Sequence, residues 1–192
     1  MVYQYLINNL SVQTGDIICT VDGNEASSDL KGEFWRVLGK LIPGDVDHII
    51  VYVGPEGGCI EAAAKGYVNR FQVQNNIWDY RQMSDQRGGV IDTLYGIAYP
   101  LHNVQKPIEE INAIREAVGK YCNDQADSKA KYNLNFLNSN TDNTFYCSQL
   151  AYRAYLKYGI NLNTGIGIPH IPGTESIIFP QEVWEGCYHQ RA

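Results

Sequence analysis

The sequence predicts an α+β fold with an antiparallel sheet, and the order of its apolar patterns carries this prediction. Short runs rich in β-branched residues occupy the first half of the chain. Two of them, residues 48–54 and 59–64, are separated only by the turn sequence Pro-Glu-Gly-Gly. Two longer segments with apolar residues at helical spacing occupy the second half. Hairpins followed by helices, rather than strict alternation of strand and helix, are typical of α+β proteins.

The first half of the chain is expected to supply the sheet and one short helix. Residues 15–21 predict a strand that a Gly-Asp turn opens. Residues 28–45 predict a short helix that ends at Pro-Gly, because their apolar residues recur at helical spacing. The hairpin follows, and further strands are predicted within residues 66–73 and 89–99. The apolar residues of the short helix are Leu30, Phe34, Val37, Leu38 and Leu41.

The second half is expected to supply two helices and an extended tail. Residues 107–121 begin with proline and two glutamates, which favour a helix amino terminus, and they repeat apolar residues at helical spacing. Residues 144–159 predict a second helix, with Thr144 as its N-cap and Gly159 as its stop. Residues 168–186 are interrupted by Pro-Gly and leave room for a single short strand or helix. The apolar stripe of the second helix is Cys147, Leu150, Ala151, Ala154 and Tyr158.

Length and composition are those of an ordinary globular protein, so a single domain over residues 1–192 is expected. The formal charge of −6 and the pI near 5.1 argue against binding to nucleic acid, which needs clustered Lys and Arg. The chain shows neither a basic leader nor an apolar run long enough to span a membrane. A cytoplasmic location is therefore expected, with removal of an export signal as the alternative.

The five cysteines are odd in number and include no CxxC pair, which fits reduced thiols better than a disulfide framework or a zinc site. No metal or other cofactor is expected. Cys147 differs from the others because it falls in the first turn of a predicted helix, where unpaired N–H groups favour negative charge. A thiol reacts as its thiolate. Cys147 is therefore a candidate nucleophile, although a free cysteine considered alone is most often an inert core residue.

His48 stands at the head of a β-branched strand, where a hydrophobic residue or a solvated polar one is usual. An imidazole there can act as general base for a nearby thiol, and it needs a third polar group to hold its tautomer. Glu61 is the best candidate, because a hairpin register that opposes residues 50 and 59 also opposes 48 and 61. The alternatives without catalysis are a histidine bonded to a backbone carbonyl and a glutamate on an exposed hairpin face.

These residues resemble a family of cysteine hydrolases. Residues 43–54 (PGDVDHIIVYVG), followed by a glycine-rich turn and CIEAA, look like the His strand and the third-residue strand of the NlpC-type papain-like cysteine peptidases. The Cys segment, residues 145–155 (FYCSQLAYRAY), comes last in this chain, whereas it usually comes first in that family. This order resembles the circularly permuted branch, which includes YiiX-like proteins and the lecithin:retinol acyltransferase group. The resemblance extends, with gaps, over residues 15–185.

The resemblance implies a permuted papain-like (NlpC-type) fold, in which an antiparallel sheet or partial barrel packs against helices. It implies Cys147 as nucleophile, His48 as base and Glu61 as the residue that orients His48. The backbone N–H of Cys147 is then expected in an oxyanion hole. A glutamate at the third position resembles the YiiX-like branch more than the acyltransferases, which tend to carry a second histidine there. Amide chemistry is therefore expected in preference to lipid acyl transfer.

The expected activity is that of a cysteine peptidase or amidase on small peptides or peptidoglycan-derived (cell-wall) fragments, with no cofactor. Tyr146, His170 and Asp47 are expected to contact the substrate, and Asp45 and Asp47 are alternatives to Glu61 as the orienting group. One alternative function keeps the same centre for a lipid acyl hydrolase or acyltransferase, which predicts an exposed apolar rim and membrane association. The other is a non-catalytic binding module of this fold.

Overall fold

Strands and helices combine into an α+β fold around an antiparallel sheet, as the sequence predicts. The computed structural model describes residues 1–22 and 42–192, so the helix predicted over 28–45 lies almost entirely outside the described residues. Among the described residues, six strands form the sheet in the order β10-β7-β3-β4-β5-β6, and every neighbouring pair is antiparallel. These strands are β3 (Ile17–Val21), β4 (His48–Tyr52), β5 (Gly58–Ala62), β6 (Val68–Gln72), β7 (Thr93–Tyr99) and β10 (Tyr188–Arg191).

The hairpin of β4 and β5 forms where the sequence predicts it, but in a different register. Val51 opposes Ile60 and Tyr52 opposes Cys59, whereas the predicted register opposes residue 50 to 59. The turn that sets this register needs a glycine at position 57, which has φ +83° and where a Cβ would lie 2.2 Å from the carbonyl oxygen of Val73. The register differs by two residues, so each side chain keeps its predicted face of the sheet.

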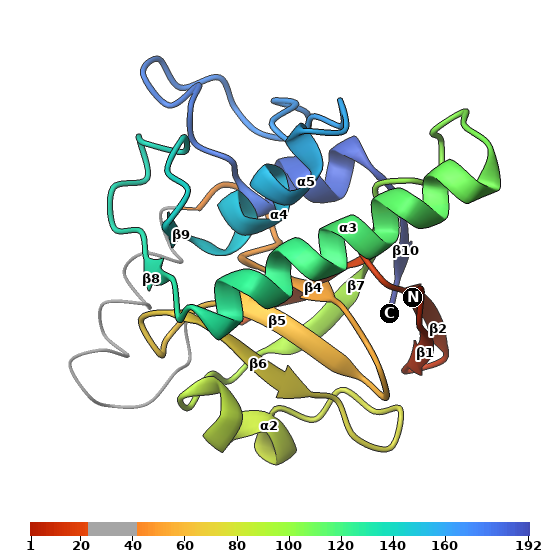
Figure 1. Cartoon of the computed structure of the whole chain (residues 1–192). Coiled ribbons are helices and arrows are strands. Elements are labelled where there is room, and N and C mark those ends of the chain that lie inside the picture. Colours follow the sequence, from red (N-terminus) through yellow and green to blue (C-terminus); the bar gives the residue numbers. More distant parts are fainter. Residues whose placement is uncertain (23–41) are drawn as a thin grey trace.

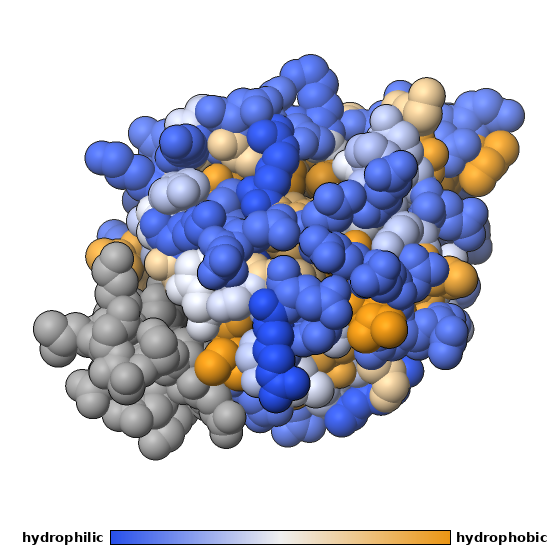
Figure 2. Space-filling model, turned by 90° about the horizontal axis from the view of Figure 1, so that it is seen from below, coloured by the Kyte–Doolittle hydropathy of each residue, from blue (hydrophilic) through white to orange (hydrophobic). Residues whose placement is uncertain are grey.

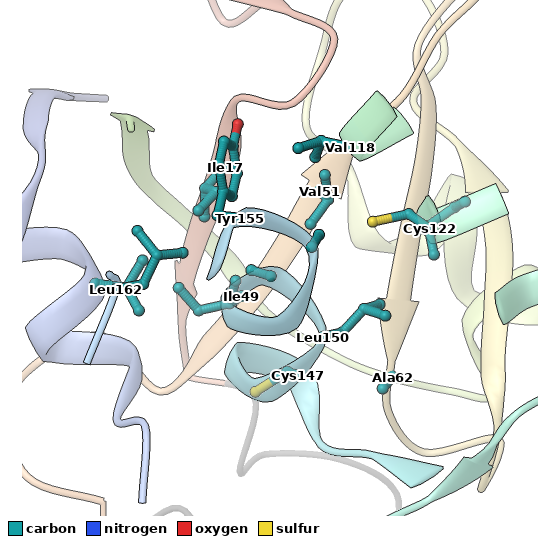
Figure 3. Close-up of a cluster of buried hydrophobic side chains, with 14 of the residues drawn as sticks. Ile17, Ile49, Val51, Ala62, Val118, Cys122, Cys147, Leu150, Tyr155 and Leu162 are labelled. Carbon is teal, nitrogen blue, oxygen red and sulfur yellow. The ribbon is translucent and has the colours of Figure 1, made fainter. Parts of the chain in front are cut away.

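Two helices cover one face of the sheet, as Figure 1 shows. Helix α3 (Ile108–Asp127) continues six residues beyond its predicted end, and α4 (Cys147–Leu156) begins later than predicted, since Thr144 belongs to a short strand, β9 (Thr144–Phe145), that pairs with β8 (Lys131–Tyr132). The residues buried between these helices and the sheet are called the upper core. It includes Ile17, Ile49, Val51, Ile60, Val118, Cys122, Leu150, Ala151, Ala154 and Tyr155, several of which are labelled in Figure 3.

The opposite face of the sheet packs against elements that the sequence pattern does not predict. These are the hairpin of β1 (Gln4–Ile7) and β2 (Leu10–Gln13) and the helix α2 (Tyr80–Arg87). The residues buried on this side are called the lower core and include Ile7, Val12, Ile18, Ile50, Tyr52, Phe71, Trp78 and Met83. The side of the molecule where α2 lies is mostly hydrophilic in Figure 2, because α2 turns Met83 and Arg87 inward and its polar side chains outward.

The tail forms two elements where the sequence pattern allows one. Helix α5 (Pro180–Gly186) is followed directly by β10, which pairs with β7 at the edge of the sheet. Gln181 of α5 accepts hydrogen bonds at its Oε1 from the backbone N–H groups of Asp45 (2.9 Å) and Val46 (3.0 Å). The tail therefore holds the segment that leads into β4. No helix within residues 1–22 and 42–192 is both long and apolar enough to cross a lipid bilayer.

Candidate active site

Cys147 is the first residue of α4, and its sulfur lies at the lower end of that helix in Figure 3. The N-cap is Tyr146, which has an extended backbone (φ −92°, ψ 171°), rather than the predicted Thr144. The first turn of a helix has N–H groups without partners inside the helix, and its dipole favours negative charge. Cys147 is buried, with 9% of the residue exposed.

A buried amide group fixes the start of α4. Gln149 is fully buried and accepts hydrogen bonds at Oε1 from the backbone N–H of Tyr146 (3.2 Å) and from Nδ2 of Asn133 (2.9 Å). Its Nε2 donates to Oγ1 of Thr141 (2.8 Å), and Ser148 donates from Oγ to the carbonyl oxygen of Ile178 (2.6 Å). These contacts tie the loops before and after α4 to its first turn. The sequence analysis missed Gln149, because a glutamine in a helix gives no signal of burial.

His48 lies at the end of strand β4, on the face of the sheet opposite to helix α4 and Cys147. Strand alternation places it on the side of Ile50 and Tyr52, which belong to the lower core, whereas α4 covers the upper core. His48 is the first residue of β4, so its ring lies at the strand end, close enough to the sulfur of Cys147 to lower the pKa of that thiol. The side chain of His48 is 13% exposed. The two side chains therefore influence each other's pKa around the end of the sheet.

The pKa of the Cys147 thiol is lowered and the pKa of the His48 imidazole is raised, so each side chain favours the charged form of the other. Burial favours the neutral thiol, but the hydrogen bond and charge of His48, together with the backbone N–H groups of Ile49 and Ser148, lower the pKa of Cys147 below its ordinary value. Burial likewise disfavours the imidazolium, but hydrogen bonds to Cys147 and Glu61 raise the pKa of His48 to about 10. Compared with isolated side chains, this pair favours a thiolate next to an imidazolium.

The cysteine at this site is chemically distinct from the other four. All five cysteines lie in the described part of the chain, and all are free thiols. Burial raises the pKa of each of the others, to about 12 for Cys122 and Cys187. Those thiols are neutral at physiological pH and are poor nucleophiles.

Glu61 of β5 is the carboxylate that hydrogen-bonds His48. Its Oε2 lies 2.9 Å from Nε2 of His48. The predicted register placed the two residues directly opposite each other. In the observed register they are diagonal neighbours on one face of the sheet, a separation that two long side chains can span. Glu61 is fully buried, which raises the pKa of a carboxyl group, but the charge of Arg87 and the hydrogen bond to His48 lower that pKa to about 2. Glu61 is therefore ionised.

Arg87 and Asp92 extend this chain of charged groups and were missed by the sequence analysis. Arg87 is the last residue of α2 and donates from Nη2 to Oε2 of Glu61 (2.9 Å), while its Nη1 donates to Oδ1 of Asp92 (2.7 Å). Arg87 is fully buried. Nothing in the local sequence marks it, because α2 is a short polar helix and arginine is ordinarily a surface residue.

The residues predicted to contact substrate are spread around the site. The hydroxyl of Tyr146 accepts a hydrogen bond from the backbone N–H of Ile178 (3.0 Å), and its ring is buried, so it anchors the loop before α5. His170 is exposed in that loop. Asp47 directly precedes His48, and its backbone N–H donates to the carbonyl oxygen of Thr20 (3.1 Å). Substrate contacts by these three residues stay predictions.

Asp45, the other alternative to Glu61, does not orient His48. Its Oδ2 accepts a hydrogen bond from the hydroxyl of Tyr95 (3.1 Å), and its backbone is held by Gln181.

In the described part of the chain, no three His, Cys, Asp or Glu side chains come together as a metal site. Comparisons of the chain with protein-family models, curated proteins and solved structures give no match.

Proposed function

We propose that the protein is a cysteine hydrolase, a peptidase or amidase, that cleaves amide bonds with Cys147 as nucleophile, His48 as general base and acid, and Glu61 as the residue that orients His48. The observation that carries the proposal is the position of His48, which hydrogen-bonds the buried carboxylate of Glu61 and lies next to Cys147, where it lowers the pKa of the thiol while its own pKa is raised. Inert packing of a free cysteine explains neither the partner nor the direction of these shifts.

The proposed reaction proceeds through a thioester. The Cys147 thiolate attacks the carbonyl carbon of the amide, forming a C–S bond and an oxyanion near the amino terminus of α4, where free backbone N–H groups stabilise it. The His48 imidazolium then protonates the departing amine as the C–N bond breaks. The resulting neutral imidazole takes a proton from water, whose oxygen attacks the thioester. Release of the carboxylic acid restores the thiolate and the imidazolium.

The order of the catalytic elements supports a permuted papain-like fold as part of the proposal. The His strand β4 and the Glu strand β5 precede the Cys helix α4, and α4 packs directly on β4. This is the arrangement expected from the resemblance to the permuted NlpC-type branch. The proposed substrates are small peptides or peptidoglycan-derived fragments, because Glu61 occupies the position at which the acyltransferase branch tends to carry a second histidine.

Thiol labelling tests the reactivity of the site without knowledge of the substrate. We expect iodoacetamide at pH 6 to alkylate Cys147 at least about tenfold faster than any other cysteine, because only Cys147 has a lowered pKa. Peptide mass spectrometry over a time course measures the five rates. The Cys147→Ala variant is the control and should lose the fast phase. Equal labelling of all accessible thiols would instead favour a non-catalytic binding module.

A substrate panel separates amide from lipid chemistry. We expect purified protein to hydrolyse one or more γ-linked or D-amino-acid peptides, and the Cys147→Ala variant to hydrolyse none. Phospholipids and lipid esters are offered in parallel, with released amines and fatty acids measured by mass spectrometry. Turnover of lipids alone would contradict the proposed substrate class while leaving the nucleophile in place. Hydrolysis that persists in Cys147→Ala would exclude Cys147 as the nucleophile.

A further inference from the structure

Behind the proposed catalytic residues lies a fully buried arginine that reaches Glu61 from the lower side of the sheet. Figure 1 shows α2 on that side, opposite α3 and α4. Arg87 Nε donates to both carboxylate oxygens of Glu61, at 3.1 Å from Oε1 and 3.2 Å from Oε2, and Nη2 lies 2.9 Å from Oε2. The same Oε2 atom bonds His48. Arg87 therefore fixes the plane of the carboxylate that meets the imidazole.

Arg87 is itself held on three sides. Its Nη1 and Nη2 bind the two carboxylate oxygens of Asp92 at 2.7 and 2.8 Å, and Nε1 of Trp78 donates to Oδ1 of Asp92 (3.3 Å). The guanidinium carbon lies 4.7 Å from the ring centroid of Phe71 and 5.2 Å from that of Trp78. A side chain with this many fixed partners has one position, so it can hold Glu61 in one position as well.

The charges around Glu61 alternate in sign along the chain of contacts. His48 faces Glu61 from β4, Arg87 faces it from α2, and Asp92 lies on the far side of Arg87. Cys59, on the same strand as Glu61, is a further titratable neighbour within the described residues; burial raises its pKa, so it is neutral. A fully buried carboxyl group tends to take up a proton unless a cation lies next to it. Arg87 supplies that cation independently of the protonation state of His48.

We infer that Arg87 is a positioning residue of the proposed hydrolase: through Glu61 it keeps His48 oriented and charged, and so keeps Cys147 in its reactive thiolate form. The inference rests on the proposed function for its catalytic meaning. Its physical content, a link from a buried arginine in α2 to the reactivity of a thiol in α4, is measurable without a substrate. The competing explanation is that the pair of Arg87 with Glu61 and Asp92 only stabilises the fold.

The chain contains a matched control for that competing explanation. Arg115 of α3 is also buried and binds Asp16 through Nη1 (2.7 Å), with a second bond from Nη1 to the carbonyl oxygen of Thr14 (2.9 Å). None of these groups contacts His48 or Glu61 through a hydrogen bond among the described residues. Arg115→Met removes a buried arginine from an ion pair, as Arg87→Met does, but leaves the catalytic charges alone.

The experiment measures the rate of Cys147 alkylation by iodoacetamide from pH 4 to 10 in each folded variant. We expect Arg87→Met to raise the apparent pKa of Cys147 by one unit or more, which slows labelling at pH 6 about tenfold or more. Arg87→Lys, which keeps the charge but not the paired hydrogen bonds, should give a smaller shift. Arg115→Met should give the wild-type profile whatever its effect on the melting temperature.

A second measurement shows whether Arg87 acts through Glu61. In a double-mutant cycle, Arg87→Met should change the labelling profile of the Glu61→Gln protein much less than that of wild type, because both changes interrupt one chain. If Arg87→Met does not fold, Asp92→Asn and Arg87→Lys are used for the same comparison. Asp92→Asn weakens the contacts that hold Arg87, and Arg87→Lys keeps a cation at this position.

The outcomes separate the inference from the proposed function. A wild-type labelling profile in folded Arg87→Met, or equal shifts in Arg87→Met and Arg115→Met, would overturn the role of Arg87 alone. Slow labelling of Cys147 in the unmodified protein would overturn the proposed hydrolase instead. Additive effects of Arg87→Met and Glu61→Gln would show that Arg87 does not act through Glu61.

Discussion

Replacing His48 with asparagine is expected to lower kcat/KM for amide hydrolysis by about 10²- to 10⁴-fold, the range typical for loss of a general acid and base. Thiol reactivity should fall as well. Without the imidazolium, burial acts unopposed on Cys147 and raises the pKa of its thiol. Steady-state hydrolysis of the best peptide in the panel and iodoacetamide labelling at pH 6 measure the two losses on the same protein sample.

The control for His48→Asn is the same substitution at His102. That histidine is exposed and stacks on the ring of Tyr188, away from the contacts of Cys147. His102→Asn should retain wild-type hydrolysis and labelling. Hydrolysis within a few fold of wild type in a folded His48→Asn protein would contradict the role of His48, even if Cys147 proves to be the nucleophile.

Replacing Glu61 with glutamine is expected to lower the pH at which activity is lost on the alkaline side of the pH profile. It should also lower the maximal kcat/KM by about 10²-fold or more. Glutamine keeps the size of the side chain and an oxygen that faces His48 but removes the charge. The pKa of His48 is raised to about 10 by Cys147 and Glu61, against an ordinary value of 6.5. In wild type the imidazolium therefore persists up to about pH 10, and in Glu61→Gln the alkaline limb should move toward 6.5.

The acid limb of the same profile reports the thiol. Activity rises with pH as Cys147 loses its proton, and this limb should lie below the ordinary pKa of cysteine in wild type. In Glu61→Gln it should move up, because a less stable imidazolium stabilises the thiolate less. The two limbs approach each other, and the maximum of the bell-shaped curve falls. Initial rates of peptide hydrolysis from pH 4 to 11 measure both limbs.

Glu182 provides the matched control for Glu61. It is also a fully buried carboxyl group, but it lies in α5 and accepts hydrogen bonds from the backbone N–H groups of Phe179 and Gly165, each at 2.7 Å. Glu182→Gln should leave both limbs of the pH profile in place, whatever its effect on stability. An alkaline limb that stays near pH 10 in Glu61→Gln would show that the charge of Glu61 does not hold the proton on His48.

Local sequence pattern is enough to predict the elements of this fold whose burial is recorded in their own residues. Apolar, β-branched runs bounded by turns placed β3, β4 and β5, and helical spacing placed α3 and α4, because the burial of an element leaves a direct mark on its own residues. The same local reasoning selected Cys147, at a helix start, and His48, at a strand head. The pairing of His48 with Glu61 was predicted even though the register was wrong, because a two-residue shift preserves the face of the sheet.

Tertiary structure alone decided the features that depend on distant partners. The β4–β5 hairpin turns through Gly57, which passes close to the backbone of Val73 just after β6, a contact that no strand pattern encodes. Arg87 and Gln149 are buried because partners elsewhere in the chain satisfy their polar groups, so their residue types alone predict exposure. Cys147 and His48 come from opposite faces and meet at the end of the sheet. The local sequence pattern determines which face of an element a side chain occupies, whereas its contact partners depend on how distant elements pack.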